Sequence, residues 1–246
     1  MKRKLFVASS LSVLGLTGCG SVGNAITEGP MHKVLPGAEA VSHALIGTHG
    51  LARTYADSEV SSEYRIDSLA TPADSAYAQD ARNGFRSFRL VVDGLVDRPQ
   101  RLDINTLRGM PLQTQITRHD CVEGWSVIGK WRGVRLSDVL ARAQPKIGAR
   151  YVVFHCLDHD EQGTQYYESL DLHQAAHPQA LLCLDLNDRP VAPDHGAPVR
   201  LRVPTQLGYK SAKWVSRIEL ASTYSALGTG KGGYWEDQGY EWFAGI

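Results

Sequence analysis

The stretch TRHDCVEGWS, residues 117–126, places one cysteine among charged and aromatic neighbours. The strand-like sequence LQTQITR at 112–118 leads into it, so we expect Cys121 to lie in a loop at the end of a strand. Four roles are open for this residue: a small buried hydrophobic side chain, half of a disulfide, a nucleophile or a metal ligand.

The cysteine count narrows these roles. The chain has four cysteines, and if Cys19 is lipidated an odd number remains, so at least one thiol stays unpaired within the chain. Cys156 in VVFHC and Cys183 in LLCLDL lie in apolar strand patterns, which favour a buried structural role. Cys121 has Arg118 three residues before it, and a nearby cation favours the thiolate, the form that attacks or binds metals.

Three chemical interpretations of a Cys121 thiolate remain open. A nucleophile needs a positioned base, and His119 could serve only if the backbone turns sharply. Zinc needs three or four protein ligands, and HDC at 119–121 supplies two at most. A soft metal could instead take one protein thiolate and receive its other ligands from a cofactor. Spacing alone does not choose among the three.

Composition and charge indicate a globular protein. The chain has 246 residues, 43% hydrophobic and 21% charged, which suits one large domain or two small ones. Its 26 basic and 26 acidic residues balance, so no global charge points to nucleic acid or an anionic membrane. Basic charge is concentrated locally, as a solvated face or a candidate anion site, in Arg200, Arg202, Lys210, Lys213 and Arg217.

The N-terminus reads as an export signal. Three basic residues precede an apolar run at 5–16 that is too short to span a bilayer. LTGC at 16–19 resembles a bacterial lipobox, which predicts lipid anchoring at Cys19 in the periplasm or cell envelope; an ordinary cleaved signal is the alternative. KRKLF at 2–6 also resembles a weakened twin-arginine signal. We therefore expect an export signal at 1–19, a tether at 20–63 and the folded domain at 64–246.

The rest of the chain predicts an α+β fold that is rich in mixed β-structure and has short helices. Strand patterns outnumber helical ones, and no repeat, GxGxxG or P-loop pattern occurs. Helices are expected at 103–110, 136–143 and 171–178. Strands are expected at 88–96, 112–118, 150–156, 165–170, 181–187, 199–204 and 212–220.

The sequence around Cys121 resembles the molybdopterin-binding domain of the sulfite oxidase family. The resemblance begins with RHDCVEGWSVIGKWRGVRLSDVL and continues through LLCLDLNDRPVAPDHGAPVRLRVPTQLGYKSAKWVSRIEL to the tail GGYWEDQGYEW. It covers approximately residues 64–246 and looks closest to the branch with the bacterial periplasmic methionine-sulfoxide reductase catalytic subunit. It therefore implies the sulfite oxidase-type molybdopterin-binding fold.

The resemblance implies a role for each candidate residue. Cys121 would be the thiolate ligand of the molybdenum in a molybdopterin cofactor. Cations and backbone N–H groups bind phosphate, so Arg200 and the segment Ser211, Ala212 and Lys213 would hold the anionic end of the pterin. Arg202 and Lys210 stay undecided, because alternate strand positions point to opposite faces.

Three further positions take expected roles. His195 stands where the reductases have an asparagine and resembles the histidine of sulfite oxidases, so it would contact the pterin. Cys156 stands where the reductases have a threonine, in a cofactor-binding position. Arg118 would be a catalytic cation near the metal, with a salt bridge to Asp120 or Glu123 as its alternative role.

The implied function is a molybdenum cofactor-dependent oxidoreductase that transfers an oxygen atom on a sulfur compound, by S-oxide reduction or sulfite-type oxidation. The alternatives are a non-catalytic envelope lipoprotein that binds a partner or pterin, and a metal-free thiol enzyme. The sequence has no CxxCH haem motif, so we expect a haem-containing membrane subunit or a cytochrome as electron partner. The substrate would be a small sulfur compound or oxidised methionine, and the protein a monomer that does not bind nucleic acid.

Overall fold

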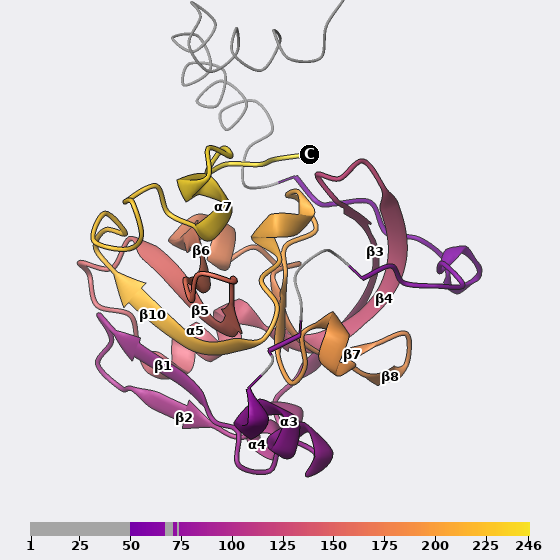
Figure 1. Cartoon of the computed structure of the whole chain (residues 1–246), viewed down its shortest axis with the longest axis horizontal. Helices are drawn as coiled ribbons and strands as arrows, with labels where there is room; N and C mark the ends of the chain where they lie inside the picture. The colour runs from indigo at the N-terminus through magenta and orange to yellow at the C-terminus, as the bar shows by residue number, and fades with distance from the viewer. Residues whose placement is uncertain (1–49, 67–70, 73) are drawn as a thin grey trace, which may run out of the picture. The chain divides into compact units, whose positions relative to one another are not determined.

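The computed structural model describes residues 50–66, 71–72 and 74–246. The expected export signal and lipidated Cys19 lie outside this range, as does most of the expected tether. Two five-stranded sheets, one on either side of the view in Figure 1, form the domain. The helices are short, which confirms the predicted α+β class.

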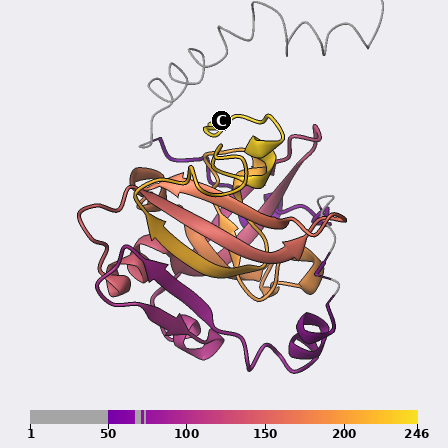
Figure 2. The same cartoon turned by 60° about the vertical axis from the view of Figure 1, so that its left-hand side comes forward.

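The first sheet has the strand order β2-β1-β10-β5-β6 and is seen from another side in Figure 2. Its strand β1 pairs in parallel with β10, and the other neighbours are antiparallel. The first strand in the sequence, β1, thus lies beside the last, β10. The strands are β1 (Leu90–Gly94), β2 (Gln100–Leu102), β5 (Tyr151–His159), β6 (Gln165–Asp171) and β10 (Val215–Ala221).

The second sheet has the order β3-β4-β7-β8, with β9 also paired to β7. Its strands are β3 (Leu112–Asp120), β4 (Ser126–Arg135), β7 (Leu181–Leu186), β8 (Arg189–Pro190) and β9 (Arg200–Arg202). Strand β4 was not among the strands predicted from the sequence. It pairs with β3 along the whole length of β3, and its other side pairs with β7. The β3–β4 hairpin places Cys121 in its turn, at one end of the sheet.

Side-chain caps explain where two of the short helices begin. Asp103 accepts a hydrogen bond from the Thr106 amide at 2.7 Å, and Asp171 accepts one from the Gln174 amide at the same distance. Both starts agree with the sequence. The α-helices are α3 (Ser75–Arg82), α4 (Ile104–Arg108), α5 (Leu136–Ala143), α6 (Leu172–Ala175) and α7 (Tyr234–Asp237). The 3-10 turns are η2 (Asp57–Glu59), η3 (Pro193–His195) and η4 (Gly208–Lys210).

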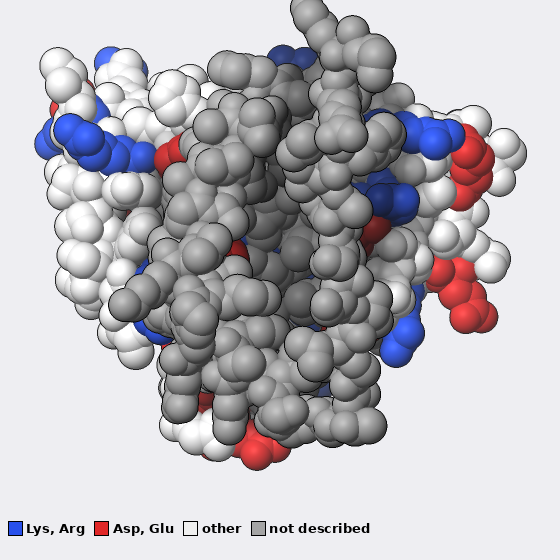
Figure 3. Space-filling view, turned by 90° about the horizontal axis from the view of Figure 1, so that it is seen from above, with Lys and Arg blue, Asp and Glu red and all other residues white. Residues whose placement is uncertain are grey.

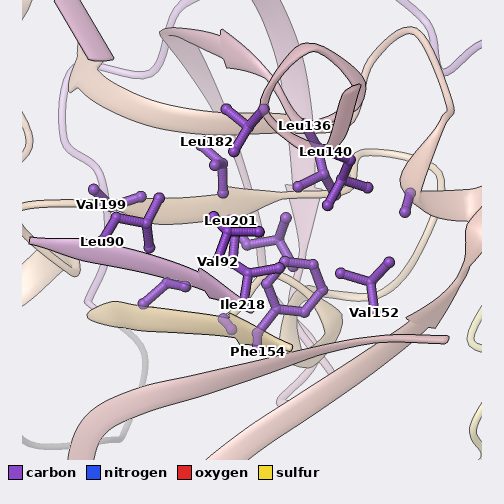
Figure 4. Close-up of a cluster of buried hydrophobic side chains, with 14 of the residues drawn as sticks. Leu90, Val92, Leu136, Leu140, Val152, Phe154, Leu182, Val199, Leu201 and Ile218 are labelled. Atoms are coloured by element: carbon purple, nitrogen blue, oxygen red, sulfur yellow. The ribbon is translucent and has the colours of Figure 1, made fainter. Parts of the chain in front are cut away.

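The main hydrophobic core lies where both sheets and α5 meet (Figure 4). One face of α5 carries Leu136 and Leu140 into it, as the helical spacing predicts. Phe154 of β5 and Leu182 of β7 are fully buried there. Because this core packs the two sheets against each other, it fixes the positions of the strand ends from which the loops begin.

The described residues before Tyr64 lie against the second sheet. The Tyr55 amide donates to the Ile116 carbonyl at 3.0 Å, and Thr54 forms a bridge with Thr117. Ser61 then donates its amide to Ile128 at 3.0 Å. The outer edge of β3 is therefore partly covered by this earlier segment.

The surface carries mixed charge. On the face in Figure 3, basic and acidic side chains lie interspersed wherever described residues are visible, in keeping with the net charge of zero. Within the described ranges, no helix has both the length and the apolar character needed to cross a bilayer.

A glycine in β4 is essential for the pairing of β4 with β7. A Cβ at Gly133 would lie 2.1 Å from the Leu182 carbonyl oxygen, which is backbone and has little freedom to move. We expect Gly133→Ala to lower the free energy of unfolding by roughly 3 kcal/mol or more, measured by urea denaturation. Gly109→Ala is the control, because its Cβ would meet its nearest neighbour at 3.4 Å, and an equal loss in both variants would contradict this explanation.

Candidate functional site

Cys121 occupies the turn between β3 and β4. The strands pair as far as Asp120 and Ser126, and the turn closes with a hydrogen bond from the Cys121 amide to the Trp125 carbonyl at 2.9 Å. The Gly124 amide donates to the Cys121 carbonyl at 3.0 Å, and Gly124 has a φ of +85°, which glycine adopts without strain. The backbone of the cysteine is thus held by the hairpin.

Side chains of the same turn support it. The Trp125 indole donates to the Glu123 carboxylate at 2.8 Å, a contact within the loop itself. The centroid of the Trp125 ring lies 5.9 Å from that of buried His119, and the Arg65 guanidinium lies over the Trp125 ring at 5.2 Å from its centroid. The segment around Arg65, which precedes β1 in the sequence, therefore contacts the loop that carries Cys121.

A pocket opens beside this turn, and we call it the Cys121 pocket. Its empty volume is about 600 Å³, a figure that includes open solvent at the mouth. It brings together four of the predicted site residues: Cys121, Ser211, Ala212 and Lys213. The other residues that line the pocket were not predicted from the sequence: Val122, Glu123, Asp158, Tyr166, Gly208, Tyr209, Trp235 and Tyr240.

Three of these residues form an aromatic wall: Tyr166, Tyr209 and Trp235. The Tyr166 hydroxyl donates to the Tyr209 carbonyl at 2.8 Å, and the Tyr209 hydroxyl donates to the Glu241 carbonyl at 2.6 Å. These hydroxyls are committed to backbone carbonyls, so the wall offers mainly ring surface to the pocket. The C-terminal tail packs against the domain and also supplies Trp235 and Tyr240 to the pocket.

The segment that follows β9 lies directly against the Cys121 hairpin. A Cβ at Gly208 would lie 2.5 Å from His119 Nε2 and 3.2 Å from the Asp120 carbonyl oxygen. Only glycine allows η4 to approach β3 this closely. The approach places Ser211, Ala212 and Lys213 on the same pocket as the cysteine, although some ninety positions separate them.

Arg202 is a buried cation between these two segments. Its guanidinium donates to Ser211 Oγ at 3.3 Å and to the Thr117 hydroxyl at 3.4 Å, and it makes a short hydrogen bond to the Arg118 carbonyl. Burial lowers the pKa of Arg202 to about 10. Within the described part of the chain, no carboxylate pairs with it and its Nε has no hydrogen-bond partner. A fully buried guanidinium in this state favours a nearby anion.

Arg200 and His195 form an adjoining cluster rather than part of the Cys121 pocket. The Arg200 guanidinium donates to the His195 carbonyl at 3.0 Å and lies 5.3 Å from the Trp131 ring centroid. Tyr64 packs edge-on against both aromatic partners, with centroids 5.5 Å from His195 and 5.2 Å from Trp131. Position 64 carried no signal in the sequence, because the segment before the first strand lacks periodicity.

The turn that carries His195 packs against the segment that carries Lys213. Gly196 has a φ of +103°, and a Cβ there would lie 2.8 Å from the Lys213 Cβ. The Trp214 indole donates to the Pro193 carbonyl at 2.7 Å. The turn that carries His195 therefore packs against Lys213 through Gly196.

Cys156 is fully buried in β5, where it pairs with Val215 of β10. Burial raises the pKa of the Cys156 thiol well above its ordinary value, and Asp158 and Glu168 add to the effect while Lys213 opposes it. Cys183 in β7 is also buried, and burial raises its pKa to about 12. Both thiols stay protonated near neutral pH, whereas Cys121 is partly exposed in its pocket.

Arg118 does not join the other candidates. It is exposed on β3, between the buried residues Thr117 and His119, and so faces away from them. Its Nε lies 2.8 Å from the Asp120 carboxylate, the salt bridge considered as its alternative role. It lines a different hollow from Cys121, so we leave it out of the candidate site.

Comparison with known proteins decides the family. The model of the oxidoreductase molybdopterin binding domain matches residues 77–227. The chain belongs to this family.

Two similar proteins extend the match. An Azospira oryzae protein named "Putative protein-methionine-sulfoxide reductase subunit YedZ1" is 34% identical over 248 residues, which cover 99% of this chain and 87% of the relative. The crystal structure of the sulfane dehydrogenase SoxCD from Paracoccus pantotrophus aligns with a TM-score of 0.51 at 22% identity. That alignment covers 56% of this chain and 39% of the SoxCD chain, and it shows the sulfite oxidase-type fold.

The residues of the site fit the molybdenum cofactor of this family. Among the described residues, no group of three or more His, Cys, Asp or Glu could hold a metal ion, so a metal at Cys121 needs ligands from elsewhere. Molybdopterin supplies such sulfur ligands, and its phosphate suits the buried guanidinium of Arg202. When bound, the cofactor supplies two-electron oxygen-atom chemistry, and the protein fixes its position. Cys121 would hold the metal, and Arg200, Arg202 and the 211–213 segment would hold the pterin.

We expect Cys121→Ser to abolish activity, with a loss of at least about 100-fold, because a hydroxyl does not replace a soft thiolate ligand. The visible absorption that arises from a thiolate–metal bond should disappear at the same time. Cys183→Ser is the matched control, a buried thiol outside the pocket, and should keep both the absorption and the activity. Unchanged absorption in Cys121→Ser would contradict the ligand assignment.

We expect Arg202→Met to purify with less than about a tenth of the molybdopterin of the wild-type protein, because charge-assisted hydrogen bonds to a buried anion contribute strongly to binding. Arg118→Met changes a cation of the same type on β3 that is paired at the surface, and should retain the full content. The measurement is the amount of pterin and molybdenum per protein. Equal content in both variants would remove Arg202 from the site.

Proposed function

We propose that this molybdopterin oxidoreductase reduces S-oxides, with oxidised methionine as the substrate class. The observation that carries the proposal is the charge of the Cys121 pocket, whose acidic and basic lining residues are two carboxyl groups, Glu123 and Asp158, and one amine, Lys213. Sulfite is an anion, and two carboxylates would repel it. A sulfoxide is neutral but strongly polar, and it suits a pocket that combines polar hydrogen-bond donors such as Lys213 with an aromatic wall.

The protein residues have distinct parts in this reaction. Reduction consumes two electrons and two protons, breaks the S–O bond, and releases a sulfide and one water molecule. The Lys213 ammonium has three N–H donors, so in addition to its contact with the pterin it would donate one hydrogen bond to the sulfoxide oxygen, where negative charge develops. The aromatic wall would contact the methyl and methylene groups next to the sulfur and exclude water from them. The relative's name supports the same direction of reaction.

Electrons must come from a partner, because the chain carries no haem attachment motif. The Azospira oryzae relative is named as a subunit, which supports an assembly with a second protein. We propose a haem-containing membrane subunit or a cytochrome as this donor. The export signal at 1–19 and the lipobox cysteine Cys19 support a periplasmic or envelope location near such a partner.

A paired assay tests the direction of the reaction. With reduced viologen as donor, methionine sulfoxide should be reduced at least about 100-fold more efficiently, by kcat/KM, than sulfite is oxidised with ferricyanide as acceptor. Glu123→Gln removes one of the two carboxylates and should lower KM for sulfite while leaving the order of the two activities unchanged. Efficient sulfite oxidation by the wild-type protein, without sulfoxide reduction, would overturn the proposal.

A further inference from the structure

A fully buried group of charged side chains lies behind the aromatic wall. Lys210 of η4 contacts the carboxyl groups of Glu168 in β6 and Glu236 in α7, and we call these three residues the buried triad. The contact to Glu236 is 2.5 Å, and that to Glu168 is also very short. The side chains are between 0 and 1% exposed.

The charges of the buried triad do not balance unless it also holds a proton. One amine and two carboxylates would leave one negative charge in a site without water contact, which is costly. Each carboxyl group also has one buried oxygen, Oε2, that makes no hydrogen bond in the structure, and a proton on one of these oxygens would reduce the uncompensated charge. Burial, more than any other cause, raises the pKa of Glu168 well above its ordinary value, although Lys210 opposes the shift.

Each member of the buried triad lies within two residues of a residue of the aromatic wall in the sequence. Lys210 follows Tyr209 and Glu236 follows Trp235. Glu168 lies two residues after Tyr166 on β6, so the two point to the same face of the strand. The triad thus connects three elements that are far apart in the sequence, at the points where each supplies one ring to the Cys121 pocket.

Gly233 leaves the space that the triad needs. A Cβ at this position would lie 2.0 Å from Glu236 Oε2 and 2.9 Å from Glu168 Oε1. Lys210 also lies over the ring of Trp242 at 5.4 Å, and the Trp242 indole donates to Ser169 at 2.9 Å. The C-terminal tail is therefore folded around the triad, which fixes the position of α7.

We propose that the buried triad holds one proton between its two carboxyl groups and positions the aromatic wall of the Cys121 pocket. Its members are positioning residues, because none of them lines the pocket. The role in substrate binding rests on the proposed function, whereas the proton count does not.

The first experiment measures stability. Glu168→Gln and Glu236→Gln each remove one carboxyl group but leave Lys210 balanced by the other, so each should shift Tm by less than about 3 °C. The double variant leaves a buried ammonium without an anion and should lose about 10 °C or more. Glu219→Gln, which breaks a partly exposed ion pair with Arg217, is the control and should behave like the single variants. Large losses in both single variants would overturn the shared proton.

The second experiment measures the proton itself. Because folding raises the pKa of Glu168, the folded protein keeps a proton that the unfolded chain releases above about pH 4.5, and stability falls as pH rises from there towards the folded pKa. Relative to Glu168→Gln, the unfolding equilibrium constant of the wild-type protein should rise by up to tenfold per pH unit between pH 5 and 7. Parallel pH profiles would contradict the proposal.

The groups that surround Glu168 are common to both proteins in this comparison. They come from β5, β6, η4 and α7, and because Lys210 and Glu236 interact directly with Glu168, the difference between the two profiles reports the titration of the buried triad as a whole. They are Cys156, Tyr166, Tyr167, Lys210, Glu236 and Asp237.

The third experiment separates positioning from stability. Glu236→Ala leaves Lys210 balanced by Glu168 but cuts the connection to α7, so KM for methionine sulfoxide should rise at least fivefold, with kcat within about twofold of wild type. Glu236→Gln keeps the hydrogen bonds and should restore KM. Both variants should keep full molybdenum content.

An unchanged KM in Glu236→Ala would overturn the positioning role. If the wild-type holoenzyme reduces no sulfoxide, the proposed function fails, and the stability and pH experiments still decide on the shared proton.

Discussion

The site depends on one interaction, the buried guanidinium of Arg202 between the end of β3 and Ser211. An uncompensated charge in such a place costs several kcal/mol, so the fold gains from an anion that binds there. The same side chain holds two segments together, one with the cysteine and one with the Ser211–Lys213 residues. Affinity for an anionic cofactor and the local arrangement of the chain therefore have a common origin. Removal of the charge would weaken both at once.

Local patterns in the sequence were sufficient for much of the fold. The apolar spacing of α5 and the caps at Asp103 and Asp171 depend on neighbours within a few residues, and the structure has them where the sequence indicates. The strand β4 was missed because its sequence, SVIGKWRGVR, mixes glycines and charged residues with apolar ones. Its strand character arises from its two partners, β3 and β7, which no local pattern reveals.

In the candidate site, too, some residues could be predicted from local sequence and others depend on tertiary contacts. Motifs that resemble the family located Cys121 and the Ser211–Lys213 segment, and the structure brings them to one pocket. The aromatic wall and the buried triad join β6, η4 and α7, and such contacts depend on tertiary packing that a single sequence does not encode locally. Arg118 illustrates the opposite case. Its distance in sequence from Cys121 is short, but strand alternation turns it away from the pocket.

The position of β10 between β1 and β5 has a consequence for the order of folding. A ribosome releases β1 long before β10, so the first sheet has a gap at its centre until nearly the whole chain has been synthesised. The pocket residues that follow β9 and those in α7 are synthesised later than most of the core. Cofactor insertion therefore has to wait for a complete polypeptide, and a truncated chain would expose unpaired strand edges in place of a partial binding site.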